Sequence, residues 1–247
     1  MMQNLVIKPD TYGPKVHSLG AVNVGTSVMA CKFKGGVLIA ADTAISYGGM
    51  KKEKDARRIW KLSDECVFSC SGEMADAQNL KKLLEKKQEA DEIEQDGAQF
   101  LKPRDYYSWI SRMNYQRRLK MNPLWCSTVV GGVRKDTGEV FLGMTDMYGT
   151  KIEHGYLLTG LATHYCQVLM ENGWHEDISE EEAKKLLSTC MTVMFYRDKK
   201  AADTVQFSVI TQAGVKMEEP ITVDSNWDLS FYKEKTNEFW RPMRIRM

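Results

Sequence analysis

Cysteine and histidine are the side chains most often used as nucleophiles, proton carriers and metal ligands near neutral pH. The chain has six cysteines and four histidines, but no Cys-x-x-Cys motif and no Cys/His spacing of the kind that holds zinc. The histidines also match no catalytic triad. We therefore expect buried free thiols in a reducing compartment, no metal and no cofactor. The residues concerned are Cys31, Cys66, Cys70, Cys126, Cys166, Cys190, His17, His154, His164 and His175.

Overall charge and hydropathy argue against several kinds of partner. The 34 basic residues nearly balance the 33 acidic ones, which gives a formal net charge of +1. Because no net positive field is available to hold a polyanion, nucleic acid is a poor candidate. No stretch approaches the ~20 apolar residues of a membrane span, and residues 1–10 do not look like a signal peptide. The sequence indicates a soluble intracellular protein without a membrane partner.

Apolar runs in the first third of the chain predict strands. Residues 27–33 and the continuous apolar run 37–41 are joined through Gly35 and Gly36, which predicts an antiparallel hairpin. The second run has no polar face, so both strands should lie in a well-buried sheet. A further strand is expected over residues 61–71.

Two helices are expected next. Leucines at helical spacing indicate an amphipathic helix from residue 75 to about residue 95, and residues 91–102 read as a polar loop. Pro103 suits the first position of a second helix, which should stop before Asn122 and Pro123.

The second half of the chain repeats this order of strands and helices. A helix is expected near residues 162–171. Ser179 and Glu182 form a capping box, which predicts the start of another amphipathic helix. The strands expected in this half are residues 126–134, 139–144, 205–211 and 214–217.

Hairpins that alternate with pairs of helices predict an α+β layered sandwich rather than a doubly wound parallel sheet. With 43% hydrophobic and 27% charged residues the chain can form a sizeable core, and no linker or repeat divides it, so we expect one domain. Residues 1–24 look like an extension ahead of this domain. Residues 226–247 carry aromatic side chains among charges, and such a tail is expected to dock on another surface.

Four short blocks carry a more specific signal through their order and spacing. They are Gly25-Thr26-Ser27-Val28, Gly36-Val37-Leu38-Ile39-Ala40-Ala41-Asp42, Ser71-Gly72-Glu73-Met74-Ala75-Asp76 and Phe195-Tyr196-Arg197-Asp198. Together they resemble the proteasome beta-type subunits of the N-terminal nucleophile hydrolase superfamily, over most of the chain. The resemblance implies a four-layer αββα sandwich. It also implies a propeptide-like extension (1–25), a proteasome beta-type domain (26–225) and a C-terminal docking tail (226–247).

A second group of residues resembles one particular position in the beta ring of that family, the position of a non-catalytic subunit. It comprises residues 115–125 and the triplet Asn226-Trp227-Asp228 together with the extended C-terminus. The basic residues in the first of these segments also fit a simpler interpretation, a solvated helix end beside a proline stop.

In active members of the family the chain is cut before a threonine, and the freed amine serves as general base while the threonine hydroxyl attacks the peptide carbonyl. A lysine places positive charge near the hydroxyl, an acid holds that lysine, and a backbone N–H stabilises the oxyanion. The resemblance places the nucleophile on Thr26, the acid on Asp42 and the oxyanion N–H on Gly72. Arg58 occupies the position of the lysine.

Several positions depart from the active pattern. A guanidinium with a pKa above ~12 cannot exchange a proton near neutral pH, so Arg58 is not a conservative substitute for lysine. The supporting acid matches Asp198, but Ala201 stands where a serine is expected and Ala44 where an arginine is usual. Thr163 matches the serine of a second support site and keeps a hydroxyl. We expect no catalytic residue, only degenerate remnants at Thr26, Asp42, Arg58, Gly72, Thr163, Asp198 and Ala201. On this interpretation Thr26 begins a strand because it is β-branched.

Three functions remain open. The chain is expected to be a non-catalytic structural subunit of the 20S proteasome core, which completes a beta ring and aids the joining of rings. Its partners would be other alpha and beta subunits in a four-ring particle of the cytoplasm and nucleus, which performs ubiquitin-dependent and other protein degradation. The alternative is an active threonine endopeptidase, released by cleavage between Gly25 and Thr26. The third is a free-standing binding or hydrolase domain.

Overall fold

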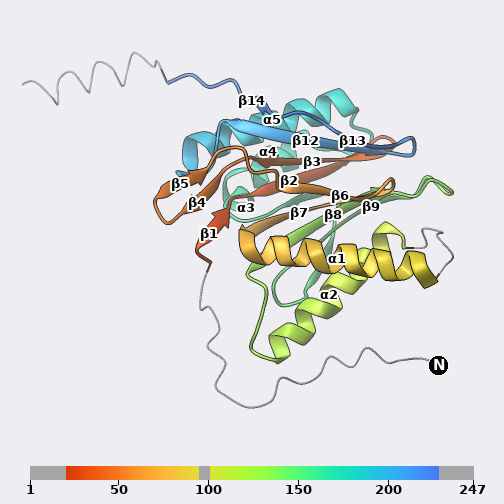
Figure 1. Ribbon diagram of the computed structural model, residues 1–247. Coiled ribbons are helices and arrows are strands. Elements are labelled where there is room, and N and C mark those ends of the chain that lie inside the picture. Colours follow the sequence, from red (N-terminus) through yellow and green to blue (C-terminus); the bar gives the residue numbers. More distant parts are fainter. Residues whose placement is uncertain (1–20, 95–100, 228–247) are drawn as a thin grey trace, which may run out of the picture.

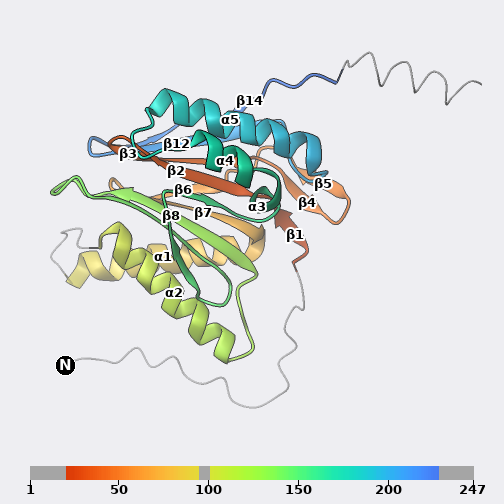
Figure 2. The same ribbon diagram turned by 180° about the vertical axis from the view of Figure 1, so that it is seen from behind.

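The computed structural model describes residues 21–94 and 101–227. Within these ranges two antiparallel β-sheets lie face to face, and helices cover the outer face of each sheet (Figure 1). The view from behind shows the same four layers (Figure 2). The α+β class and the four-layer sandwich are both confirmed.

The first sheet has the strand order β10-β9-β8-β7-β1-β4-β5, and β6 also pairs with β7. The strand β1 is antiparallel to both of its neighbours, β4 and β7. The β4–β5 hairpin is thus joined to the remainder of this sheet through β1. The bounds are β1 Asn23–Gly25, β4 Ile45–Tyr47, β5 Met50–Glu53, β6 Ile59–Ser63, β7 Cys66–Glu73, β8 Cys126–Val133, β9 Val140–Thr145 and β10 Lys151–Glu153.

The second sheet has the order β11-β2-β3-β12-β13, and β14 also pairs with β12. Every residue of β3 is buried, because the first sheet covers one of its faces and helices cover the other. The bounds are β2 Val28–Phe33, β3 Gly36–Asp42, β11 Tyr156–Leu158, β12 Thr204–Thr211, β13 Gly214–Met217 and β14 Ile221–Thr222.

The helices pack in two groups. The first sheet is covered by α1 (Met74–Glu94) and α2 (Pro103–Leu119), whereas α3 (Ala162–Tyr165), α4 (Gln167–Gly173) and α5 (Glu180–Arg197) cover the second (Figures 1 and 2). Each group buries one hydrophobic cluster against its sheet, and a third cluster lies between the sheets. Of the helices in the described ranges, none is long and apolar enough to cross a membrane.

Most of the predicted elements are confirmed. The two expected hairpins are β2–β3 and β8–β9, and Pro103 is the first residue of α2. The capping box is present, since the Glu182 N–H donates to the Ser179 hydroxyl (3.3 Å) and the Ser179 N–H donates to the Glu182 carboxylate (3.1 Å). The last expected strands are β12 and β13.

Three predictions of detail are wrong. Residues 61–71 form two strands rather than one, because β6 ends at Ser63 and β7 begins at Cys66. The intervening turn contains neither glycine nor proline, the strongest turn signals, so only the weaker turn formers Ser63 and Asp64 mark it. The single helix expected near residues 162–171 is the pair α3 and α4, and the loop expected from residue 91 starts later, since α1 continues to Glu94.

The segment before Thr26 enters the sheet earlier than the sequence suggests. Residues 23–25 form β1, although their sequence, Asn-Val-Gly, carries a weak strand signal. Pairing with a strand on each side holds them in place. The domain boundaries remain predictions, and most of the predicted tail, residues 228–247, lies outside the described ranges together with residues 1–20.

All six cysteines are buried with free thiols, which confirms the predicted burial. Burial raises the pKa of Cys31 to about 12 and also raises the pKa of Cys66. The neutral thiol is favoured because a buried thiolate would lose its hydration. These cysteines behave as small core residues.

Candidate functional site around Thr26

Thr26 lies where the chain crosses from one sheet to the other, between β1 of the first sheet and β2 of the second. Asp42 is the last residue of β3, and Arg58 directly precedes β6. All three residues are at least nine-tenths buried. Residues from three separate segments therefore meet at the junction of the two sheets.

The carboxylate of Asp42 is fully engaged. Its Oδ1 accepts a hydrogen bond from the Thr26 hydroxyl (2.7 Å) and forms an ion pair with Arg58 Nη2. Its Oδ2 accepts a hydrogen bond from the Ala202 N–H (2.9 Å). The side chain of Thr26 is thus fixed as a donor to an acid whose charge is balanced by a guanidinium.

The guanidinium of Arg58 has an acceptor for each of its five N–H groups. Two acceptors belong to Asp42, namely its carbonyl (3.0 Å from Nε) and its carboxylate. The other three are the carbonyls of Thr26 (2.9 Å), Cys70 (3.1 Å) and Ser27 (3.3 Å). Because Cys70 belongs to β7 and Asp42 to β3, this side chain cross-links the two sheets.

Gly25 makes room for this cross-link. A Cβ at this position would lie 2.7 Å from Arg58 Cδ and 3.0 Å from its Nη1. Any side chain here would therefore displace the guanidinium from its acceptors. Glycine is therefore required before Thr26 for steric reasons, whether or not the chain is cleaved at this bond.

The chain itself covers the strand edges beside Thr26. In β1, Gly25 pairs with Gly72 of β7 on one side and with Ile45 of β4 on the other. The Glu73 carboxylate accepts hydrogen bonds from the N–H groups of Val22 and Asn23 (3.0 Å for the latter) and anchors the segment further. In the uncut chain the nitrogen of Thr26 is an amide, which cannot serve as a general base.

Gly72 needs the absence of a side chain for two reasons. Its φ is +110°, and a Cβ would lie 2.3 Å from the carbonyl oxygen of Trp125. The residue lines the pocket beside Thr26, as the resemblance implies for an oxyanion site. Its partner across the β1–β7 pair is Gly25.

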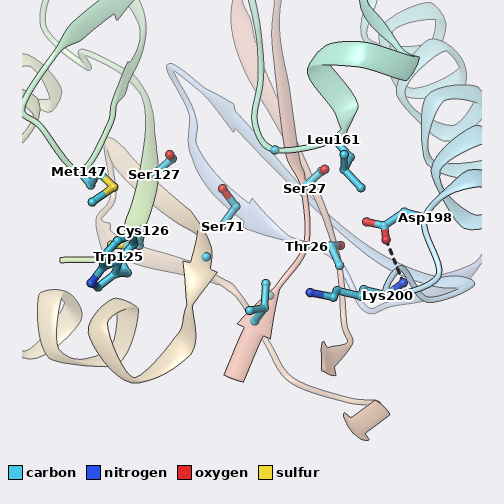
Figure 3. A pocket seen from close by; sticks show the side chains of 14 residues that line it. Thr26, Ser27, Ser71, Trp125, Cys126, Ser127, Met147, Leu161, Asp198 and Lys200 are labelled. Carbon is cyan, nitrogen blue, oxygen red and sulfur yellow. Dashed lines mark hydrogen bonds between the residues drawn. The ribbon is translucent and has the colours of Figure 1, made fainter. Parts of the chain in front are cut away.

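The pocket beside Thr26 has a volume of ≈ 300 Å³. Figure 3 shows three serine hydroxyls, from Ser27, Ser71 and Ser127, around the space between the sheets. Ser27 is already used, because its hydroxyl accepts a hydrogen bond from the Ala162 N–H (3.0 Å). Lys200 also lines the pocket, and its backbone N–H donates to Asp198 Oδ1 (2.9 Å; Figure 3).

Of the three remaining predicted residues, Asp198 lines the pocket, whereas Thr163 and Ala201 do not. Asp198 lines the pocket at the end of α5, but its carboxylate and carbonyl accept hydrogen bonds from the N–H groups of Lys200 and Ala201 and close a local turn. The Thr163 hydroxyl donates to the Leu158 carbonyl (3.3 Å), and this exposed residue is not among those lining the pocket. Ala201 is buried in the hydrophobic cluster under α5.

Comparison with known proteins assigns this fold and site to a family. The family model for proteasome subunits matches residues 22–210, most of the chain. The chain belongs to the proteasome subunit family. Thr26, Asp42 and Arg58 all lie inside the matched range, so the site belongs to the family domain.

The most similar relatives narrow the assignment to beta-type subunits. A Xenopus laevis protein named proteasome subunit beta type-4 is 36% identical over 88% of this chain and 90% of its own length. The Arabidopsis thaliana protein of the same name is 35% identical over 86% of this chain and 85% of its own length. A probable proteasome subunit beta type-7 of Schizosaccharomyces pombe is 30% identical over 90% of this chain and 86% of its own length.

Type-4 and type-7 are two nomenclatures for the same subunit, which occupies the seventh beta position. The predicted resemblance of the chain to this subunit is therefore confirmed, whereas the assignment of that signal to residues 115–125 and the Asn226 triplet stays a prediction. The family assignment and the names of these relatives favour a proteasome subunit over the third function left open by the sequence, a free-standing binding or hydrolase domain.

Sequence reasoning missed four contributors to this site. They are Glu73, the backbone N–H of Ala202, Ser27 and Lys200. Ser27 and Glu73 lie inside the recognised blocks, so a search for polar residues next to the matched positions would have found them. Ala202 acts through its backbone, and Lys200 is one of two consecutive lysines, so neither carries a sequence signal.

Proposed function

We propose that this chain is a non-catalytic, structural subunit of the 20S proteasome core and that Thr26 serves the fold rather than peptide hydrolysis. The observation that carries the proposal is the saturated guanidinium of Arg58. A lysine at this position could move a proton and present a compact charge to the threonine. Arg58 does neither, and its N–H groups are all committed to holding the two sheets together.

The packing of β1 supports the same proposal. Peptides commonly bind to an enzyme as an added strand on an exposed sheet edge. Beside Thr26, the edges of β4 and β7 are both paired with the chain's own β1. A substrate strand would first have to displace this segment and break the hydrogen bonds of Glu73 with it.

The changed support residues add to this argument. Catalytic groups that act as a unit lose most of their effect when one member is removed. Here the lysine position holds Arg58, a serine position holds Ala201, and the hydroxyl of Thr163 is bonded to the Leu158 carbonyl. Three members of the unit are therefore altered or redirected.

The role that remains is assembly. The chain would complete a beta ring, contact other alpha and beta subunits of a four-ring particle, and aid the joining of rings through its C-terminal segment. In this way it would serve ubiquitin-dependent and other protein degradation in the cytoplasm and nucleus. Obligate interfaces of this kind commonly bury more than ~2,000 Å².

The test is an assembled particle that contains the Thr26→Ala variant. We expect normal assembly and unchanged peptidase activities, because those activities reside in other subunits. Intact-mass measurement of the wild-type subunit should show a chain that does not begin at Thr26. Loss of one peptidase activity in the variant particle would overturn the proposal.

A second candidate function is an active threonine endopeptidase released by cleavage after Gly25. The observation in its favour is that Thr26 and Lys200 line the same pocket, so an amine is available near the hydroxyl (Figure 3). A mature chain that starts at Thr26 and is labelled by an epoxyketone inhibitor would establish this function instead. Neither result is expected, since Arg58 and Asp42 hold the hydroxyl in a saturated network.

A further inference from the structure

Three aromatic rings gather where α5 ends. Trp227 is 63% exposed, and its ring meets Tyr196 and Phe195 edge to face, with centroid separations of 4.9 and 5.8 Å. The Tyr196 hydroxyl accepts a hydrogen bond from the Asn226 N–H (2.5 Å) and lies 3.2 Å from the Asn226 carbonyl oxygen. Trp227 is thus a rigidly presented aromatic side chain, of the kind that anchors protein interfaces.

Three basic residues lie on the elements that meet at these rings, and one of them contacts a ring directly. Lys51 Nζ lies 5.8 Å from the centroid of Phe195. Lys199 Nζ lies 3.4 Å from the position that a Cβ on Gly49 would take, which places it against the β4–β5 hairpin. Arg197 is exposed in the last turn of α5. We name the group formed by Lys51, Phe195, Tyr196, Arg197, Lys199 and Trp227 the Trp227 surface.

The charges of the Trp227 surface are not neutralised by the described part of the chain. Lys51, Arg197 and Lys199 form no ion pair with any residue in the described ranges. Glu53 and Asp198, which lie close to these cations in the sequence, accept hydrogen bonds from backbone N–H groups and form no ion pair with Lys51, Arg197 or Lys199 within the described ranges. Lys51 and Lys199 thus lie where the β4–β5 hairpin meets the end of α5, and the exposed Arg197 follows Tyr196 in the chain.

The adjoining strand has no pairing partner on its outer edge among the described residues. β5 is the last strand of the first sheet, and all four of its residues are exposed, with Met50 at 66%. Tyr47, opposite Met50 in the hairpin, is 49% exposed. Lysines on an edge strand deter pairing with another strand unless the incoming segment is acidic. The edge strand β5 and the Trp227 surface thus both favour a partner segment that carries negative charge.

We propose that the Trp227 surface binds an acidic segment of another proteasome subunit, with carboxylates at the three cations and an apolar side chain against Trp227. This inference rests on the proposed structural function and names the chemistry of one of its contacts. Charge complementarity across such an interface speeds encounter and selects the partner.

Other occupants fit less well. Residues 228–247 of this chain contain five basic and three acidic residues, so their net charge has the same sign as the surface. A second copy would bring the same cations against themselves. Nucleic acid is disfavoured because three cations could neutralise only about three phosphates, which gives weak, salt-sensitive binding.

Zero-length carbodiimide cross-linking of the assembled particle tests the contact directly, because it joins a lysine amine to a carboxylate that touches it. We expect Lys51 or Lys199 to be joined to an aspartate or glutamate of another subunit. Cross-links confined to this chain's own residues 228–247, to a second copy of this chain, or to no residue at all would overturn the inference.

Charge reversal tests the energetic side. The double variant Lys51→Glu/Lys199→Glu should enter the particle about 10-fold more slowly than the wild type at low salt, and the difference should shrink at high salt. The matched control is Lys82→Glu/Lys86→Glu, two exposed lysines on α1 without ion pairs in the described ranges. The control should enter at the wild-type rate.

The outcomes separate the two proposals. If the wild-type chain enters the particle and both double variants enter at the same rate, the inference fails and the structural function stands. If the wild-type chain does not enter any particle, both fail. Trp227→Ala should also slow entry, and in this variant the slowing should persist at high salt, because the lost contact is apolar.

Discussion

Arg58 holds Asp42 at two points, with Nε donating to the carbonyl (3.0 Å) and Nη2 paired with the carboxylate. The same carboxylate accepts the hydroxyl proton of Thr26. The Asp42–Arg58 pair is thus part of a buried cross-link between the sheets. The predictions that follow probe this cross-link and the core around it.

Arg58→Lys should lower the free energy of unfolding by about 2–4 kcal/mol and should not create peptidase activity. An ammonium has three donors, so at least two of the five acceptors would be left without a partner in the core. Urea unfolding measures the first effect and epoxyketone labelling the second. The matched control is Arg57→Lys at the neighbouring exposed position, which should change stability by less than about 0.5 kcal/mol.

Asp42→Asn should be more damaging than the loss of a single hydrogen bond. It removes the negative charge but leaves the guanidinium of Arg58 buried, and breaking one side of a buried ion pair typically costs about 3–5 kcal/mol. Thr26→Val, which removes only the hydroxyl donor, should cost about 1–2 kcal/mol. Equal costs in thermal or urea unfolding would contradict the proposed order of importance.

Gly25→Ala should destabilise the chain by about 1–3 kcal/mol, because its Cβ would overlap Arg58 and force the guanidinium away from its acceptors. Gly49→Ala is the control, since a Cβ there would meet the flexible end of Lys199 at 3.4 Å. Comparison of the two urea midpoints measures the difference. A Gly25→Ala variant as stable as the control would show that Arg58 adapts at no cost.

Stability should fall at alkaline pH through buried thiols, of which Cys31 is one and Cys66 another, so Cys31→Ala should remove only part of the slope. Burial raises the folded-state pKa of Cys31 to about 12 from an ordinary value of 9.0, so the unfolded chain loses this proton first. Its contribution is therefore complete below pH 9 and is lost as the pH rises toward 12, by up to about 1.4 kcal/mol per pH unit. Urea unfolding between pH 8 and 10.5 measures the slope, and Cys31→Ala should reduce it without abolishing it.

The thiols give an independent check of the same burial. At pH 8 iodoacetamide should modify Cys31 and Cys66 slowly in the folded chain and rapidly in urea, because only the thiolate of an accessible cysteine reacts. Mass spectrometry of the alkylated peptides measures both rates. Rapid modification of the folded chain would place these residues outside the core.

Much of the architecture could be predicted from local patterns. The apolar run of β3, the hairpin glycines at residues 35 and 36, and the Ser179 capping box each depend on neighbours in the chain, so the sequence contains their signal. The order and spacing of the four sequence blocks likewise indicated the family without any information on tertiary contacts. The arginine at position 58 is the basis for the prediction that this site is not catalytic.

Only the tertiary structure decided what these residues do instead. Strand β1 has three residues and no strong strand signal, and it forms because β4 and β7 supply partners from distant parts of the chain. The five acceptors of Arg58 come from three separate segments of the chain, and no local pattern can indicate that they converge. The sequence determines that position 26 is threonine. The position of its hydroxyl depends on long-range packing, because its burial and its hydrogen bond to Asp42 arise only when the two sheets meet.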